Sequence, residues 1–191
     1  MNKTSGNLHS VAATAAPSSQ VRTLTLSGVF VALLTVSAYL SFPLPFTPAK
    51  VTALTIMVNL VGFMMRPRQA AITMTVYLLL GAVGVPVFGA GDGGMGKLLG
   101  PTGGFYFGFW LAAVGISALR GQSTRFKTCV LLGVCLGMPV IYVGGCISMY
   151  LVAKVGLWKT LIMAVFPFIF GDVLKTFAAA FIAKQMHKAG L

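Results

Sequence analysis

Asp172 and Lys175 are the residues whose types and spacing point most clearly to chemistry. They lie three positions apart in the apolar segment PFIFGDVLK at 167–175, and Asp172 is one of only two acidic residues in the chain. An ionisable side chain at membrane depth costs roughly 2.5–3.5 kcal/mol on insertion scales, and residues three apart share a helix face. Asp172 can accept N–H hydrogen bonds and Lys175 can donate to a carbonyl, which predicts a polar-ligand site. An ion pair that only neutralises itself is the alternative.

A glycine-rich connection at 84–104 is the second unusual stretch. It holds nine of the 23 glycines, so its backbone can adopt conformations closed to other residues and can approach a ligand closely. A flexible outer loop is the alternative, although Phe88, Leu98 and Leu99 are poor choices for a solvated linker. Within this connection, Lys97 is a candidate partner for a ligand carboxylate.

The chain has few residues that could catalyse a reaction. Asp92 and Asp172 are the only carboxylate side chains that could act as acid, base or metal ligand. The segment GDGGMGK at 91–97 matches most of a phosphate-binding loop, but Leu98 stands where the Mg²⁺-binding hydroxyl belongs. The three cysteines lack a CxxC spacing and are expected to be small core residues. We therefore expect neither an enzyme nor a metal site, and no cofactor.

The composition is that of an integral membrane protein. Apolar residues make up 57% of the chain and charged residues 8%, whereas soluble proteins carry about 25% charged residues. The apolar blocks are long enough to cross a hydrocarbon core of about 30 Å as helices. The net charge of +12 comes from basic residues near the block ends, where they act as topology signals and contact anionic lipid. Nucleic acid is therefore not expected as a partner.

Six apolar blocks predict an all-α membrane protein with six transmembrane helices. The blocks are 23–42, 50–65, 69–86, 104–119, 128–152 and 160–183, the last interrupted by Pro167. We expect a disordered cytoplasmic tail at 1–20, a single transmembrane domain at 21–186 and a C-terminal tail at 187–191. A cleaved signal peptide is the alternative at the N-terminus, but the apolar run there is too long for its hydrophobic region.

The basic residues predict that both termini are cytoplasmic. In that orientation the cytoplasmic side receives nine of them and the outer side four, in agreement with the preference of Lys and Arg for the cytoplasmic side. The nine are Lys3, Arg22, Arg66, Arg68, Arg120, Arg125, Lys127, Lys184 and Lys188, and the four are Lys50, Lys97, Lys154 and Lys159. This topology places the connection at 87–103 and Asp172 at the same outer face, where they can meet.

Gly28 and Ala32 form a small-x-x-x-small pattern in the first predicted span. Small residues four apart let another helix approach closely. The pattern therefore predicts a helix-packing face, either toward a partner protein or within the chain itself.

Four motifs, in order along residues 24–184, resemble the BioY family, the biotin-binding S components of energy-coupling-factor (ECF) transporters. They are PLPFTP at 43–48 followed by Val51 and Thr52, YLLLGAVGVPVF at 77–88, LGPTGG at 99–104 followed by Gly108 and Phe109, and PFIFGDVLK at 167–175. The LGPTGG and GDVLK elements together are specific.

The resemblance implies a six-helix protein of the bacterial cytoplasmic membrane that captures biotin at its outer face and takes it up. Asp172 and Lys175 match the pair that contacts the ureido ring in the family, and the LGPTGG motif adds Gly100, Thr102 and Gly103 as candidate substrate-binding residues. Gly28 and Ala32 match the face that docks the transmembrane T subunit. Partners are then biotin, membrane lipid and a T subunit with two ATPase subunits, although transport by the chain alone is also compatible.

Three positions depart from the family pattern. Leu54 stands near a common Gln, Phe105 replaces a common Tyr, and Phe170 replaces a common Pro. These changes leave Asp172 and Lys175 intact, and we expect them to affect contacts with the tail of the ligand instead. Two alternative functions stay open, an S component for a different vitamin and an ion channel that depends on Asp172.

Overall fold

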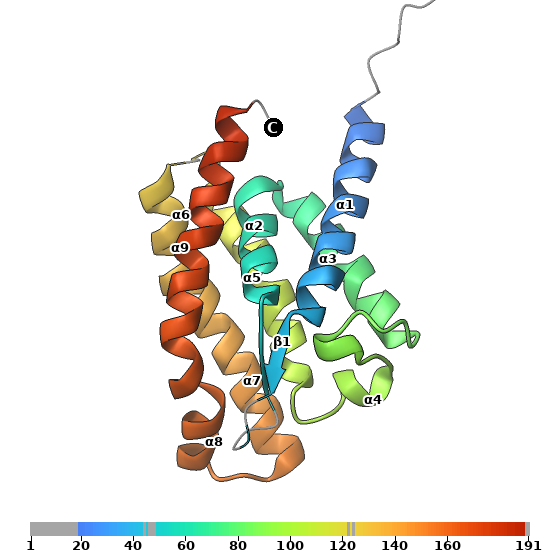
Figure 1. The fold of residues 1–191 in the computed structure, drawn as a ribbon, viewed down its shortest axis with the longest axis vertical. Coiled ribbons are helices and arrows are strands. Elements are labelled where there is room, and N and C mark those ends of the chain that lie inside the picture. Colours follow the sequence, from blue (N-terminus) through green and yellow to red (C-terminus); the bar gives the residue numbers. More distant parts are fainter. Residues whose placement is uncertain (1–18, 44, 46–48, 122, 124, 190–191) are drawn as a thin grey trace, which may run out of the picture.

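The computed structural model describes residues 19–43, 45, 49–121, 123 and 125–189, which fold into a bundle of helices with one short β-hairpin (Figure 1). Residues 1–18 of the predicted tail lie outside these ranges. Helix α1 already includes residues 19 and 20, and the last helix continues to Lys188, past the predicted domain end at 186.

Helices make up most of the described chain. The helices are α1 (Ser19–Tyr39), α2 (Leu54–Met64), α3 (Pro67–Ala82), α4 (Met95–Leu98), α5 (Gly103–Arg120), α6 (Phe126–Leu132), α7 (Met138–Ala153), α8 (Leu157–Ala164) and α9 (Phe166–Lys188). The strands are β1 (Ser41–Pro43) and β2 (Lys50–Thr52), and the short turns are η1 (Gly89–Gly91), a 3₁₀ turn, and η2 (Gly133–Gly137), a π-helical turn.

Three helical stretches of the described chain are long and apolar enough to cross a membrane: Val21–Tyr39, Phe126–Ala153 and Trp158–Lys188. The second runs through α6, η2 and α7 without a break in helical direction. The third bends at Val165, whose φ and ψ of −123° and −62° are not helical. Pro167 follows in the first turn of α9, where its missing N–H has no helical acceptor to lose. The predicted interruption near Pro167 is therefore confirmed.

The second predicted span, 50–65, is wrong at its start. Lys50–Thr52 pairs antiparallel with Ser41–Pro43, so strand hydrogen bonds and not helical ones satisfy this backbone. The first span accordingly ends at Tyr39 and not at 42. Helix α2 is left with 11 residues, a length of about 16 Å at 1.5 Å per residue, and cannot cross a membrane alone.

Helices α2 and α5 form the centre of the bundle. Helix α2 packs against α5, α9 and α1, and α5 packs against α7, α2 and α3. Most of α2 is buried, including Val58, Val61 and Phe63, as expected for a helix that is apolar on all sides. The long outer helices instead expose large apolar side chains such as Leu24, Leu151 and Leu174, which suits contact with lipid.

Glycines let α5 and α7 approach closely. A Cβ on Gly104 would collide with the carbonyl oxygen of Gly144, and a Cβ on Gly108 would lie 2.9 Å from the Cα of Ile141. Small residues at such contacts allow backbone-to-backbone packing in membrane proteins. This contact fixes α7 beside the start of α5.

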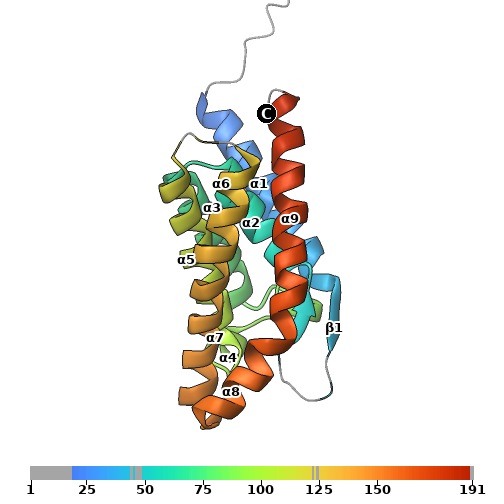
Figure 2. The same cartoon turned by 90° about the vertical axis from the view of Figure 1, so that its left-hand side faces the viewer.

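The two ends of the bundle differ. The start of α1 and the end of α9 lie at one end, and the β-hairpin, α4 and α8 lie at the other (Figures 1 and 2). The glycine-rich connection and the start of α9 are therefore at the same end of the molecule, as the sequence predicted.

Gly104→Ala tests the close contact of α5 and α7. We expect it to reduce the free energy of unfolding by about 1–3 kcal/mol, the usual cost of overpacking, measured as a lower unfolding temperature of the detergent-solubilised protein. Gly28→Ala is the matched control, because nothing lies within 4 Å of a Cβ at Gly28. An equal response of the two variants would contradict the packing.

Candidate ligand-binding pocket

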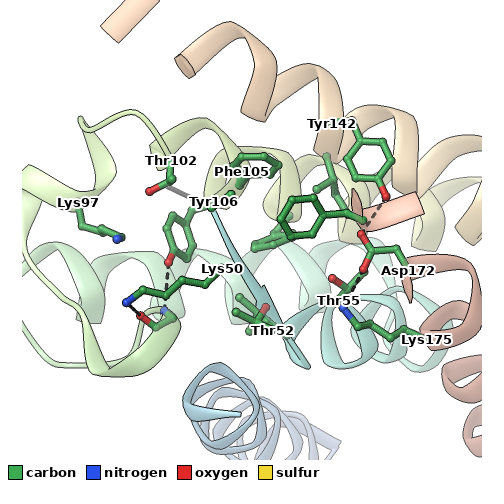
Figure 3. A pocket seen from close by; sticks show the side chains of 16 residues that line it. Lys50, Thr52, Thr55, Lys97, Thr102, Phe105, Tyr106, Tyr142, Asp172 and Lys175 are labelled. Carbon is green, nitrogen blue, oxygen red and sulfur yellow. Dashed lines mark hydrogen bonds and ion pairs between the residues drawn. The ribbon is translucent and has the colours of Figure 1, made fainter. Parts of the chain in front are cut away.

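A pocket opens between the β-hairpin, the glycine-rich connection and helices α2, α5, α7 and α9 (Figure 3). Its empty space, including the part open to solvent, is about 610 Å³. Figure 3 shows charged side chains at two separate ends, with aromatic rings between them. The pocket thus suits an elongated ligand that is polar at both ends.

Asp172 forms the more buried end, where two donors hold it. The Nζ of Lys175 lies 3.0 Å from Oδ1, and the hydroxyl of Tyr142 donates a 2.9 Å hydrogen bond to Oδ2. The side chain of Asp172 is only 6% exposed. Each carboxylate oxygen has a further lone pair, so Asp172 can still accept N–H groups from a ligand. All three side chains line the pocket, which favours a ligand site over a self-contained ion pair.

Polar contacts one turn further along α9 hold this end in place. Thr176 donates through Oγ1 to the backbone oxygen of Asp172 at 2.8 Å, and Asn59 donates through Nδ2 to Oγ1 of Thr176 at 3.2 Å. Thr176 and Asn59 are both fully buried. Buried polar side chains require partners, so these bonds tie α9 to α2 beside the pocket.

Lys50 and Lys97 line the opposite end of the pocket, and Asp92 pairs with both of them. Oδ2 of Asp92 lies 2.7 Å from the Nζ of Lys97 and 3.2 Å from the Nζ of Lys50. The hydrogen bond from Lys97, joined by Lys50, holds the pKa of Asp92 below its usual range, and partial burial opposes this only in part. Asp92 is therefore ionised at neutral pH. The Nζ of Lys50 also lies 3.4 Å from the carbonyl oxygen of Gly89.

Aromatic side chains line the pocket between its two ends. Phe105, Tyr106 and Phe109 come from α5, and Phe168 comes from α9. The rings of Tyr106 and Phe109 meet edge to face, with centroids 5.9 Å apart. Such a wall can bury the apolar middle of a ligand.

The glycine-rich connection is packed against the helices at 86–89. The ring of Phe88 is fully buried and fills the space that Gly81 leaves open. The hydroxyl of Tyr77 donates to the carbonyl oxygen of Val87, and the hydroxyl of Tyr39 donates to that of Pro86, both at 2.8 Å. These contacts disfavour the flexible-loop alternative for this part of the connection.

The structure divides the predicted substrate-binding residues of the connection. Lys97 and Thr102 line the pocket, but Gly100 and Gly103 do not. The carbonyl oxygen of Gly100 accepts a 2.8 Å hydrogen bond from Ser148, and a Cβ on Gly103 would collide with the backbone of Leu98. Both glycines therefore shape the connection without reaching the pocket wall.

Residue-by-residue reading missed several side chains of the pocket, namely Lys50, Thr52, Thr55 and Tyr142. From the sequence alone, Lys50 predicts only the membrane orientation. The residues around Lys50 do not indicate that a β-hairpin turns its side chain into the pocket. Tyr142 carries a hydroxyl in an apolar block, which was a usable signal, because a buried Tyr usually finds a hydrogen-bond partner.

Two of the three departures from the family pattern lie in the pocket. Leu54 and Phe105 line it, whereas Phe170 does not line it and is 84% exposed. The Phe170 change therefore does not touch a ligand in this pocket.

Gly28 and Ala32 lie on the outside of the bundle. Both are exposed, and nothing lies within 4 Å of a Cβ built on Gly28. The small-residue pattern is therefore not used for packing within the described part of the chain.

The family model for the BioY family matches residues 8–190. The chain belongs to the BioY family. Among curated BioY relatives, it is 34% identical over 168 residues to a probable biotin transporter BioY from Pyrococcus horikoshii, covering 88% of this chain and 98% of the relative. It is 33% identical over 168 residues to the biotin transporter BioY from Thermotoga maritima, covering 88% and 97%.

The fold matches a crystal structure described as the S-component for biotin from an ECF-type ABC transporter. The TM-score is 0.84, with 23% sequence identity, over 91% of this chain and 94% of that chain. The BioY sequence match and this mainly helical fold, with helices long and apolar enough to span a membrane, make the chain a multi-pass protein of the cytoplasmic membrane.

Tyr142→Phe tests the support of Asp172. We expect the loss of a hydrogen bond to a charged group to reduce the free energy of unfolding by about 1.5–3 kcal/mol, seen as a lower unfolding temperature in detergent without ligand. Tyr150→Phe is the matched control, because Tyr150 lies on the same helix and is 48% exposed. If both variants unfold at the wild-type temperature, the bond to Asp172 does not stabilise the fold.

Proposed function

We propose that this chain takes up biotin across the cytoplasmic membrane and acts as a high-affinity S component that captures biotin at the outer face. The observation that carries the proposal is the pocket, with an Asp–Lys pair at one end, two lysines at the other and aromatic side chains between. The curated relatives named as biotin transporters support the same substrate.

The Asp172 end suits the ureido ring of biotin. This ring carries N–H groups beside a carbonyl, so Asp172 can accept hydrogen bonds while Lys175 donates to the carbonyl oxygen. Tyr142 holds the other oxygen of the carboxylate in place. Because Asp172 is already paired with Lys175 at 3.0 Å, it suits ligand recognition better than ion conduction by a lone carboxylate.

The Lys97 end suits the carboxylate of biotin. Lys97 and Lys50 both line the pocket and carry ammonium groups that bind carboxylates through charge-assisted hydrogen bonds. Thr102 also lines the pocket and adds a hydroxyl. The aliphatic chain of biotin would then lie along Phe105 and Tyr106.

The proposed topology has six transmembrane helices and cytoplasmic termini. Helix α1 would cross first, followed by α2 together with the β-hairpin that precedes it, by α3 and by α5. Helix α6 continued into α7 and helix α8 continued into α9 would complete the six. The nine basic residues assigned to the cytoplasmic side support this direction. The β-hairpin and the start of α9, which contribute to the pocket wall, lie at the end opposite the start of α1 and the end of α9 (Figure 1), so the pocket would then face the outside.

Isothermal titration with biotin tests the function and the site together. Wild-type protein in detergent should bind biotin, and Asp172→Ala or Lys175→Ala should each weaken binding by at least about 1–3 kcal/mol, because the remaining buried partner is left unsatisfied. Lys184→Ala is the control, since Lys184 is an exposed residue of the same helix and should leave binding unchanged.

The outcomes separate the alternatives. A wild-type chain that ignores biotin at micromolar concentration but binds another vitamin is an S component for that vitamin. Ion flux through liposomes that Asp172→Asn abolishes would identify a channel. Unchanged affinity in both Asp172→Ala and Lys175→Ala would overturn the site assignment.

Partner subunits follow from the S-component proposal. The part of the chain that the structure describes has no phosphate-binding loop after a strand, so ATP would be used by separate ATPase subunits that act through a T subunit. The exposed face around Gly28 and Ala32 would dock the T subunit, since small residues allow close helix contact. Transport by the chain alone would need no such face.

Ala32→Leu tests the docking face. We expect it to reduce co-purification with co-expressed T and ATPase subunits severalfold while biotin binding stays at the wild-type level, because an added side chain separates the helices. Ala178→Leu, at an exposed position of α9, is the matched control. Equal recovery of the complex with Ala32→Leu would place docking elsewhere.

A further inference from the structure

Asp92 binds both lysines through a single oxygen. Its Oδ2 lies 2.7 Å from the Nζ of Lys97 and 3.2 Å from the Nζ of Lys50 (Figure 3 shows the two lysines). The two ammonium groups are therefore close together and share one internal carboxylate. A carboxylate is also what a ligand would present to them.

The charges of the pocket do not balance at this end. Asp172 and Lys175 neutralise one another, whereas Asp92 offers one negative charge to the two positive charges of Lys50 and Lys97. One positive charge is left at the rim of the pocket. A ligand with a single carboxylate supplies the missing negative charge.

We propose that Asp92 is an internal competitor for the ligand carboxylate, so that it limits the affinity for acids and keeps the preference of the pocket for acids over neutral analogues smaller than the two lysines alone would make it. This inference rests on the proposed function and extends it to a residue that does not itself line the pocket. With ligand absent, Asp92 keeps the two lysines together. With ligand bound, the lysines divide their hydrogen bonds between Asp92 and the incoming carboxylate.

The position of Asp92 allows this exchange. Its side chain is 37% exposed, so the carboxylate can be hydrated when a lysine turns to the ligand. Its backbone oxygen accepts a 2.9 Å hydrogen bond from the N–H of Phe88, and Phe88 is the buried anchor of the connection. The side chain can therefore change partners while the backbone stays where Phe88 holds it.

Titration of biotin and biotin amide against wild-type and Asp92→Asn protein tests the proposal. The amide lacks the negative charge but keeps the ureido ring. The wild-type chain should bind the acid more tightly than the amide. In Asp92→Asn the ratio of acid affinity to amide affinity should rise at least about tenfold, because the lysine charges lose their internal partner.

Lysine variants provide the second arm. Lys97→Met should lower the acid-to-amide ratio toward one while amide affinity changes little, and Lys159→Met, an exposed lysine of α8 outside the pocket, should leave the ratio unchanged. Unfolding temperatures check that each variant is folded. If Asp92→Asn does not fold, Asp92→Ser is titrated in its place, and the same rise in the ratio is expected because it also removes the charge.

The negative results are distinct. A ratio that is unchanged or lower in folded Asp92→Asn overturns the role of Asp92, and so does an unchanged ratio in Lys97→Met. A wild-type chain that binds neither biotin nor its amide overturns the proposed function itself, and the role of Asp92 with it.

Discussion

The buried pair of Asp172 and Lys175 is the interaction on which the pocket depends. A carboxylate inside an apolar bundle is stable only where neighbouring helices supply donors, and here the donors are Lys175 from the same helix and Tyr142 from α7. Thr176 and Asn59 then join the next turn of α9 to α2. The contacts that make the charge tolerable therefore also set α9 against its neighbours and aim Asp172 into the pocket.

The opposite end of the pocket obeys a different constraint. Lys50, Lys97 and Asp92 are between a quarter and two fifths exposed, and exposed ion pairs contribute little to stability because water competes for them. Packing of Phe88, and not the ion pairs, holds the connection in place. Under the proposal for Asp92, this division would let the charged groups exchange partners with a ligand while Phe88 holds the backbone around them.

Membership of the BioY family extends over nearly the whole chain, yet about two thirds of the residues differ from those of the two relatives compared above. Two departures from the family pattern, Leu54 and Phe105, lie on the pocket wall. Both are apolar, so they alter the shape of the middle of the pocket and leave its charges alone. Recognition by charged ends tolerates such changes, because hydrogen bonds and charges select the ligand while apolar walls mainly exclude water.

The membrane class, most of the helical blocks and the unusual charges of Asp172 and Lys175 could be read from the sequence alone, because hydropathy and an isolated charge in an apolar segment are local properties. The sequence also indicated the family, because four short motifs occur in the same order as in the BioY family. Only the tertiary structure decided that 50–52 is a strand, that Lys50 meets Asp92, that Tyr142 meets Asp172, and that Gly100 and Gly103 stay out of the pocket. Each of these depends on contacts between distant segments, which no local pattern encodes.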